Sequence, residues 1–179
     1  EMPPAEAPKS WQDLLNPKYK GKMGITSSPS TAGNWTGVLV MTYGEDFLRK
    51  LSTQDIRLFN ITSRAVADLN VSGELPISAR ASNAHMAESA AQGASVAWVD
   101  PGPVAVSDNG VAVLSKAPHP HAMMLMVDFM LSQQGQKIYG TLGYDSARKD
   151  TLGKANPKSK VYLEHRTTYL EDFEKWVAL

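Results

Sequence analysis

Residues 22–34 read KMGITSSPSTAGN, a short strand pattern that runs into a polar loop and then into a helix pattern. Met23 and Ile25 are the apolar residues of the strand, small or turn-forming residues follow from Thr26 to Thr31, and Ala32-Gly33 opens the helical periodicity. The first N–H groups of a helix have no partner within the helix, and the helix dipole is positive there. The loop is therefore suited to bind an anion or a carbonyl oxygen.

Beyond Thr26, this loop carries hydroxyl side chains that can donate or accept hydrogen bonds: Ser27, Ser28, Ser30 and Thr31. Serine and threonine are equally typical of an ordinary N-cap, in which a side-chain oxygen accepts a hydrogen bond from the start of its own helix. Two interpretations of the loop therefore stay open, a ligand site and a structural cap.

Strand and helix patterns alternate along the first hundred residues. A short helix is expected over residues 8–19, capped by Ser10 and stopped by Pro17, and the helix that opens near Gly33 is expected to run to Leu51 with an interruption at Gly44. The strands that follow are predicted at residues 56–61, 75–81 and 95–99. The helices are predicted at residues 64–70, with Thr62-Ser63 as the cap, and at residues 82–92. This alternation predicts a mainly parallel sheet covered by helices on both faces.

The organisation changes at Asp100-Pro-Gly-Pro103. Two apolar runs, residues 104–106 and 111–114, flank a turn-forming tetrad at residues 107–110. Three further helices are predicted. One starts at Pro120, with His119 as its cap and an apolar methionine-rich stripe, and one is capped by Ser132 and ends at Gly143. A final helix carries Tyr169 to Val177.

The composition is that of an ordinary globular protein, with 179 residues of which 42% are hydrophobic and 20% charged. Lysine plus arginine (18) balance aspartate plus glutamate (18), so the overall charge does not favour nucleic acid or an anionic membrane as a partner. The absence of cysteine excludes disulfides, thiolate zinc sites and cysteine nucleophiles. The sequence shows neither a membrane-spanning apolar run nor a signal peptide, and its proline-rich start, EMPPAEAPKSW, is typical of a linker inside a longer chain.

Several multi-residue blocks, in collinear order, carry a resemblance to a known family. They are PKSWQDLLNPKYKGKMGI (8–25), GEDFLRKL (44–51), NITSRAVADLNVSGELPIS (60–78), VDPGPVAVSDNGVAVLSKAPHPHAMMLMVDFMLSQQGQKIY (99–139) and GYDSARKD (143–150). Together with the serine-rich loop, the sequence resembles the extracellular solute-binding proteins of ABC importers, in the group that contains the ferric-ion-binding proteins. The resemblance covers nearly the whole chain.

This resemblance implies an α/β fold, a lobe of the type II periplasmic-binding-protein kind with a mainly parallel sheet flanked by helices. In that family two lobes close on a solute and the chain crosses between them more than once. By the same resemblance, residues 1–99 are the second ligand-binding lobe, residues 100–148 are a returning segment of the first lobe, and residues 149–179 are a C-terminal helix that packs on the second lobe. Most of the first lobe is then expected to be missing from this chain.

The resemblance also places the ligand contacts of the second lobe in two loops. The loop before the long helix corresponds to Ser27, Ser28, Ser30, Thr31 and Ala32, and the second loop corresponds to Ser82, Asn83 and His85. Where the ferric-binding relatives carry an adjacent tyrosine pair, this sequence has Asn83-Ala84-His85, which cannot supply the anionic phenolate oxygens that suit a ferric ion. An organic anion, a phosphonate or a chelated metal is expected in place of bare iron.

Other polar residues have competing interpretations. Arg64 starts a helix that faces the same cleft by the resemblance, and can bind a carboxylate or phosphonate in bidentate fashion or lie solvated on the helix surface. Arg80 ranks lower because a strand residue there can point outward. His85, without a second histidine or carboxylate nearby in sequence, is more typical of a structural histidine, and the His119/His121 pair favours capping over zinc. No metal site and no cofactor is predicted.

The predicted function is that of a non-enzymatic solute-binding component of an ABC importer, located in the periplasm or, in a Gram-positive cell, tethered outside the membrane. Its expected partners are a small-molecule or chelated-metal solute and an ABC permease, without nucleic acid and without direct membrane insertion. The alternatives are a hydrolase or transferase that uses the serine-rich loop as an oxyanion site, and a sensory ligand-binding domain. The sequence shows no G-x-S-x-G pattern and no histidine–aspartate constellation for catalysis.

Overall fold

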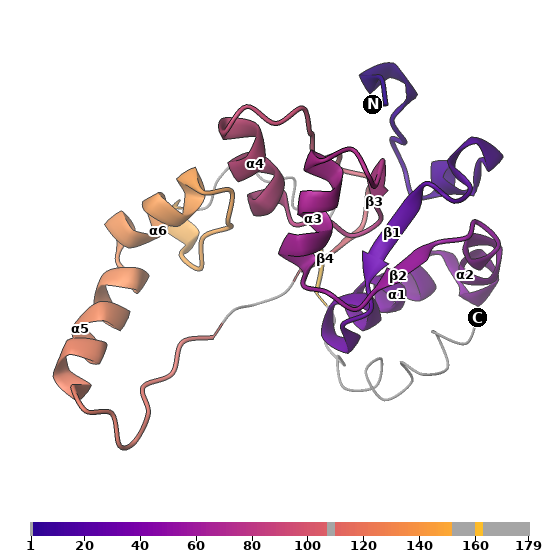
Figure 1. Cartoon of the computed structure of the whole chain (residues 1–179). Coiled ribbons are helices and arrows are strands. Elements are labelled where there is room, and N and C mark those ends of the chain that lie inside the picture. The colour runs from indigo at the N-terminus through magenta and orange to yellow at the C-terminus, as the bar shows by residue number, and fades with distance from the viewer. Residues whose placement is uncertain (1, 107–109, 152–159, 163–179) are drawn as a thin grey trace. The chain divides into compact units, whose positions relative to one another are not determined.

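The computed structural model describes residues 2–106, 110–151 and 160–162 of the chain. The chain divides into two compact units: unit 1 contains residues 1–106 and 157–179, and unit 2 contains residues 107–156 (Figure 1). Each unit is described by itself. The final helix predicted near Tyr169 and most of the predicted turn at residues 107–110 lie outside the described residues.

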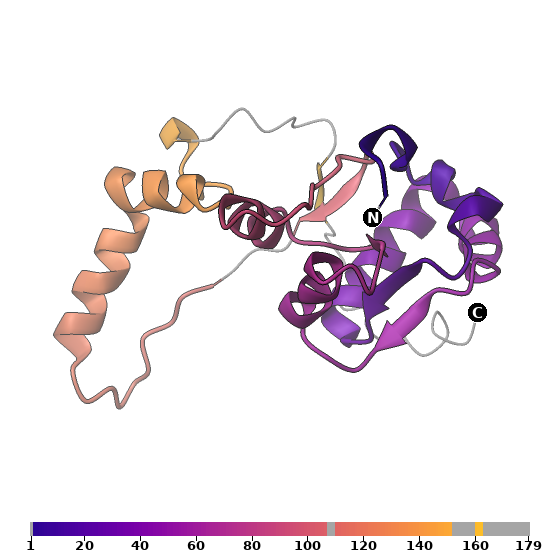
Figure 2. The same ribbon diagram turned by 45° about the horizontal axis from the view of Figure 1, so that its top comes forward.

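Unit 1 is built on a three-stranded parallel sheet with the order β2-β1-β3. The central strand is β1 (Met23–Thr26), and its neighbours are β2 (Arg57–Phe59) and β3 (Ile77–Ser78). All four residues of β1 are buried, as expected for a central strand of a parallel sheet. Figures 1 and 2 show β1 and β2 side by side, and the predicted α/β fold with a parallel sheet is confirmed.

Four helices connect or follow these strands. Helices α1 (Pro29–Tyr43) and α2 (Glu45–Ser52) lead from β1 to β2, α3 (Ser63–Val71) leads from β2 to β3, and α4 (Asn83–Ala91) follows β3. Because β2 and β3 lie on opposite sides of β1, the right-handed rule for parallel connections places α1 and α2 on one face of the sheet and α3 on the other.

Side chains of β1 point alternately to the two faces of the sheet, and each face has its own apolar core. Met23 and Ile25 belong to the main apolar cluster, which also contains residues of α1, α2 and the segment before β1, among them Trp11, Leu14, Trp35, Leu39, Phe47, Leu48 and Leu51. Gly24 points the other way: a Cβ atom there would lie 2.6 Å from the Phe59 ring and 3.0 Å from Leu75. The absence of a side chain at Gly24 thus makes room for apolar residues on the second face.

Local signals set most helix boundaries as predicted. Gly44, with φ of 80°, separates α1 from α2, and Thr62 caps α3 by accepting a hydrogen bond from the Ala65 N–H at 3.2 Å. The long helix starts earlier than predicted, at Pro29 in place of Gly33, because proline fits the first position of a helix, where no N–H partner is needed.

Two strand predictions are wrong: one strand is shorter than predicted and the other is absent. The strand expected over residues 75–81 is reduced to Ile77–Ser78, and residues 95–99 form no strand although the structure describes all of them. Trp98 donates its indole N–H to the Ala81 carbonyl at 3.3 Å. Residues 95–99 therefore lie close to the loop after β3, but their backbone does not pair with a strand. An apolar run becomes a strand only where a neighbouring strand pairs with its backbone.

The segment before β1 forms 3-10 turns in place of the predicted α-helix. They are η1 (Pro4–Glu6), η2 (Gln12–Leu15) and η3 (Pro17–Tyr19). The Asp13 carboxylate accepts hydrogen bonds from the N–H groups of Lys9 and Ser10, at 2.8 and 3.0 Å. These bonds, the Lys9 N–H first, lower the pKa of Asp13. Trp11 is buried and packs edge-to-face on Trp35, with ring centroids 6.1 Å apart, so the segment is part of the core.

The last described strands of unit 1 are β4 (Val104–Val106), at the first of the two apolar runs, and β5 (Lys160–Tyr162). They pair in parallel and form a two-stranded sheet. The carbonyl of Pro103, just before β4, accepts a hydrogen bond from the Trp11 indole N–H at 2.7 Å. The start of β4 is therefore anchored to the core of unit 1.

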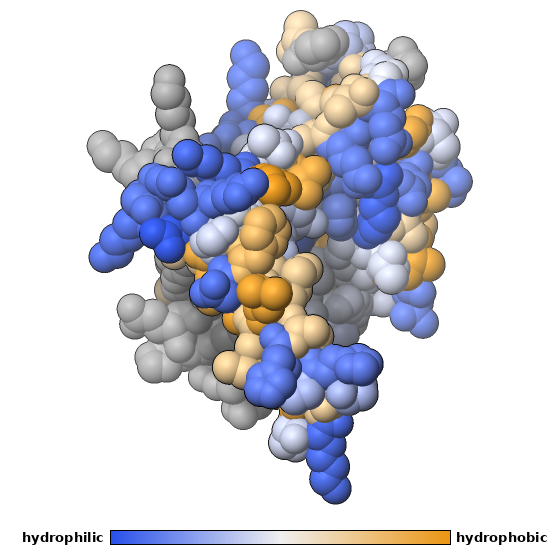
Figure 3. Space-filling model, turned by 90° about the vertical axis from the view of Figure 1, so that its left-hand side faces the viewer, coloured by the Kyte–Doolittle hydropathy of each residue, from blue (hydrophilic) through white to orange (hydrophobic). Residues whose placement is uncertain are grey.

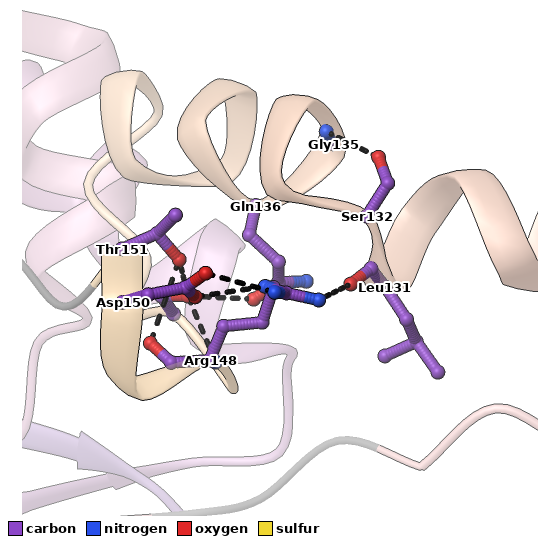
Figure 4. A network of polar contacts seen from close by, with 8 residues as sticks. Leu131, Ser132, Gly135, Gln136, Arg148, Asp150 and Thr151 are labelled. Atoms are coloured by element: carbon purple, nitrogen blue, oxygen red, sulfur yellow. Dashed lines mark hydrogen bonds and ion pairs between the residues drawn. The ribbon is translucent and has the colours of Figure 1, made fainter.

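Unit 2 consists of α5 (Pro120–Leu131), α6 (Gln133–Thr141) and the 3-10 turn η4 (Lys149–Thr151). Helix α5 starts at Pro120 as predicted, but the predicted His119 cap is absent because its side chain makes no capping hydrogen bond. Ser132 caps α6 as predicted, by accepting from the Gly135 N–H at 3.1 Å. Figure 4 shows this corner between the two helices.

Gln136 is the centre of the polar network in unit 2 (Figure 4). Its amide nitrogen donates to the Met130 carbonyl at 2.7 Å, and its amide oxygen accepts from Ser146 Oγ at 3.0 Å and from the Ala147 N–H at 2.6 Å. These bonds hold the segment after α6 against the α5–α6 corner. Arg148 forms an ion pair with Asp150 at 2.8 Å in the same segment.

Helix α5 buries none of its side chains, although most of them are apolar. Its exposed fractions include 60% for Met124, 72% for Leu125 and 44% for Phe129. Figure 3 shows such hydrophobic residues, in orange, at the molecular surface. The apolar stripe predicted from sequence is present, but no other described residue of unit 2 covers it.

Candidate functional site

The candidate residues lie where the parallel strands of unit 1 end. The carboxyl ends of β1, β2 and β3 share one edge of the sheet, because the strands are parallel neighbours. Each strand leads there into a short loop and then into a helix, namely α1, α3 and α4. In open α/β sheets this edge, at the point where the strand order reverses, is where ligands bind.

The loop after β1, residues 27–28, is tied to the loop after β2. Thr26 is buried, and its hydroxyl donates to the Ile61 carbonyl at 2.6 Å and accepts from the Ser28 N–H at 3.2 Å. The Ser27 N–H and hydroxyl both donate to the Phe59 carbonyl, at 2.8 and 3.2 Å. The first candidate loop is thus held in a defined position, and the hydroxyl proton of Ser27 is already engaged.

The N-terminus of α1 has no side-chain cap. Ser28 occupies the N-cap position, but its Oγ atom is 3.2 Å from Ser30 Oγ and accepts no N–H from the helix. The N–H groups of Thr31 and Ala32 reach only the Ser28 carbonyl, at 3.0 and 2.9 Å. The structural-cap interpretation of this loop therefore fails for the Ser28 side chain, and the ligand interpretation stays a prediction.

The second candidate loop also leads into a helix that has no side-chain cap. Ser82 is the N-cap residue of α4, and its side chain makes no capping hydrogen bond, whereas Thr62 does cap α3. Asn83, the first residue of α4, is exposed, and Ser82 and His85 are half-buried. The two helices whose loops were predicted to contact ligand are thus the two that start at this edge without a side-chain cap.

Arg64 links α3 to α4. Its guanidinium forms ion pairs with Asp68 at 3.0 Å and with Glu88 at 2.8 Å, and it donates to Ser89 Oγ at 3.3 Å. Its side chain is 37% exposed, so these pairs contribute modestly to stability. Arg64 is neither a freely solvated arginine nor an unpaired one, and its ligand role stays a prediction.

His85 lies in the first turn of α4 next to this network. Burial, followed by the positive charge of Arg64, lowers the pKa of His85 below its ordinary value. Its Nδ1 atom is buried and has no hydrogen-bond partner. Within residues 2–106, 110–151 and 160–162, no group of three histidine, aspartate or glutamate side chains is placed to hold a metal ion. His85 therefore stands as a single neutral imidazole beside charged neighbours.

Two features of this edge were not found from sequence. Thr26 was read as part of a polar loop, yet it is the buried residue that ties two loops together. Arg80 was ranked low because it was expected to lie on a strand, whereas it follows β3 in the turn before α4 and is half-buried. Neither position is marked by a local motif, since both depend on which loops become neighbours in the fold.

Two hollows on unit 2 contain no candidate residue. One of about 310 Å³ is lined by α6 residues, including Lys137 and Ile138. Another of about 620 Å³ is lined mainly by α5 residues, including Met124, Leu125 and Asp128. Both are shallow and mainly apolar, without converging polar groups, so neither has the character of a small-molecule site.

A comparison with known families supplies the identity that the geometry alone does not. A family model described as bacterial extracellular solute-binding protein matches residues 1–158. The chain belongs to this family. Membership implies a solute as ligand, a role in transport with a membrane permease, and a periplasmic or extracellular location. A comparison with curated proteins finds no match. No helix in the described part of the chain is both long and apolar enough to cross a membrane.

Proposed function

We propose that this chain is the solute-binding component of an ABC-type importer, which captures a small anionic or metal-chelate solute in a cleft between two lobes and delivers it to the permease. The observation that carries the proposal is the pair of helices, α1 and α4, that start at the carboxyl edge of the sheet without a side-chain cap. The N–H groups at these helix starts that have no backbone partner, and the hydroxyls of Ser28, Ser30, Thr31 and Ser82, are suited to hold oxygen atoms of a solute.

In this proposal the site binds and does not catalyse. Among the residues that the structure describes, no imidazole or carboxylate forms a hydrogen bond with the hydroxyls of the serine loop; Ser27 donates to a carbonyl, and Ser28 and Ser30 contact each other. A serine nucleophile requires a base within hydrogen-bond reach. Solute release then depends on lobe opening, a hinge motion whose closed state is favoured by contacts of the solute with both lobes.

The lobe assignment is part of the same proposal. Unit 1, with the candidate loops, corresponds to the second ligand-binding lobe, and unit 2 corresponds to the returning segment of the first lobe. The boundaries between the units lie at residues 106/107 and 156/157, whereas the sequence predicted 99/100 and 148/149. The C-terminal helix of the prediction falls mostly outside the described residues.

The test is to identify the small molecule that co-purifies with the complete protein by native mass spectrometry, and to measure its effect on thermal unfolding. Ligand at a hundred times its dissociation constant is expected to stabilise the protein by about 2.7 kcal/mol. The double variant S28A/S82A is expected to lose most of this stabilisation, whereas Ser52→Ala, at the end of α2, is the matched control and is expected to keep it.

The proposal is contradicted if nothing co-purifies and if anions, phosphonates, chelated iron and polyamines all leave the unfolding temperature unchanged. Turnover of a bound compound that disappears in S30A would favour the hydrolase or transferase alternative.

A further inference from the structure

Arg80 is the one arginine of the described residues without a partner. Arg49 pairs with Glu45, Arg64 with Asp68 and Glu88, and Arg148 with Asp150, while Arg57 donates to the Glu74 carbonyl. Arg80 forms no ion pair and no hydrogen bond with the described part of the chain, although it is half-buried. Burial lowers the pKa of its guanidinium, because the charge loses part of its contact with water.

The position of Arg80 is at the candidate site. It lies in the turn between β3 and α4, two residues before Ser82, the uncapped N-cap of α4. Ala79 fixes this turn to the central strand, because its N–H donates to the Gly24 carbonyl at 2.9 Å. The backbone that carries Arg80 is therefore anchored to the sheet beside the start of α4.

The charges around the start of α4 do not cancel at Arg80. The groups whose charges act on His85 are Arg64, Glu88, Asp68 and Arg80. Two carboxylates, Asp68 and Glu88, bind Arg64 directly, and His85 favours its neutral form. No described residue thus compensates the positive charge of Arg80 or the positive end of the α4 dipole beside it.

A guanidinium taken partly out of water without a partner is unfavourable for the folded state, and such a cost is offset when an anion binds to it. The planar fork of N–H donors on arginine matches the oxygens of a carboxylate or phosphonate. A bare metal cation would instead be repelled by Arg80.

We propose that Arg80 binds an oxyanion group of the solute, a carboxylate or a phosphonate, together with the first N–H groups of α4. This inference rests on the proposed solute-binding function and adds to it a residue that determines specificity for anionic solutes. Arg80, in place of the paired Arg64, is then the arginine of the site that holds the ligand.

The experiment compares the complete wild-type chain with Arg80→Gln and with Arg49→Gln, a surface arginine in an ion pair, as the control. Inorganic phosphate, citrate and methylphosphonate are titrated separately at constant ionic strength, and binding is followed by calorimetry and by the NMR signal of the Arg80 Nε–H group. Wild type and Arg49→Gln are expected to bind at least one of these probes equally well. Arg80→Gln is expected to bind it at least tenfold more weakly. Without any probe, Arg80→Gln is expected to melt at the same temperature as wild type or higher, because it removes an unpaired charge.

Three results would overturn the inference: equal binding by Arg80→Gln and wild type, a lower melting temperature of ligand-free Arg80→Gln, or wild type that binds none of the three probes. A co-purifying neutral or cationic solute that stabilises the protein would, in the last case, leave the solute-binding role intact and exclude the anionic class of solute. The failure of Arg80 as an anion ligand is therefore distinguishable from the failure of the binding function.

Discussion

Gly24 shows how a single residue of the central strand determines the packing of one face of the sheet. A methyl group at this position would lie 2.6 Å from Phe59 and 3.0 Å from Leu75, closer than carbon atoms pack. Gly24→Ala is therefore expected to lower the free energy of unfolding by about 1–3 kcal/mol, the usual cost of overpacking. Urea denaturation measures this loss.

The control for Gly24→Ala is Gly110→Ala, at which an added Cβ atom meets no atom within 4 Å. This substitution is expected to change stability by less than about 0.5 kcal/mol. Equal stability of Gly24→Ala and wild type would show that Phe59 and Leu75 move aside easily and that the second face is loosely packed.

His85 is expected to make stability depend on pH. Its pKa in the folded protein is lowered by burial first and by Arg64 next, so the unfolded chain binds the proton more strongly than the folded chain does. The stability that the neutral His85 contributes is fully present above about pH 6.5, the ordinary histidine value. It is lost as pH falls through the lower folded value.

The measurement is the free energy of unfolding of wild type and His85→Gln at several pH values between pH 4.5 and 7.5. Wild type is expected to lose stability relative to the variant on acidification. A difference between the two proteins that stays constant over this range would contradict the prediction, because it would mean that His85 titrates alike in both states.

At the scale of elements, the three helices that start at the carboxyl edge of the sheet differ in how they are capped. Thr62 accepts the Ala65 N–H at 3.2 Å, whereas the Ser82 side chain makes no such bond. Thr62→Ala is expected to cost about 1 kcal/mol, and Ser82→Ala no more than a few tenths. Equal losses in thermal unfolding of the two variants would show that Ser82 does cap α4 in solution.

The elements also show what the sequence predicts and what it does not. Breaks and caps that depend on one residue and its immediate neighbours were predicted at Gly44, Thr62 and Ser132, and the structure confirms them. Residues 8–19 were predicted as a helix but form 3-10 turns, because the Asp13 carboxylate binds the preceding N–H groups of Lys9 and Ser10 and Pro17 interrupts the pattern.

Features that depend on distant neighbours could not be predicted in this way. The strand expected at residues 95–99 has no pairing partner among the described residues, and an apolar pattern does not report the availability of a partner. Arg80 is a similar case, because no described carboxylate pairs with it, and whether a carboxylate lies nearby depends on the fold and not on the local sequence. The two loops of the candidate site were predicted from a resemblance, and their contact with a solute is a prediction.

At the scale of the whole molecule, the two units differ in how much apolar surface they bury. In α1 a continuous run from Ala32 to Leu39 is buried, whereas α5 buries no residue. Local opening requires less free energy where few apolar contacts are lost. Backbone amides of α5 are therefore expected to exchange with deuterium much faster than those of β1 and of the buried part of α1.

Hydrogen exchange followed by mass spectrometry of peptides from α1 and α5 measures this difference in the complete chain. Helix α6, in which only Gly135 and Gln136 are buried, serves as an internal comparison and is expected to exchange as α5 does. Protection of α5 as strong as that of α1 would contradict the prediction and would mean that a further surface covers its methionine-rich side.

Thr26 has a consequence for the thermodynamics of binding. Through one hydroxyl it holds the Ile61 carbonyl and the Ser28 N–H, so that the serine loop is already fixed before any solute arrives. A loop that is already ordered loses little conformational entropy when the ligand binds, so affinity increases without any additional contact. Thr26→Val, which keeps the shape and removes the hydroxyl, is thus expected to weaken solute binding mainly through a less favourable entropy, although Thr26 need not touch the solute.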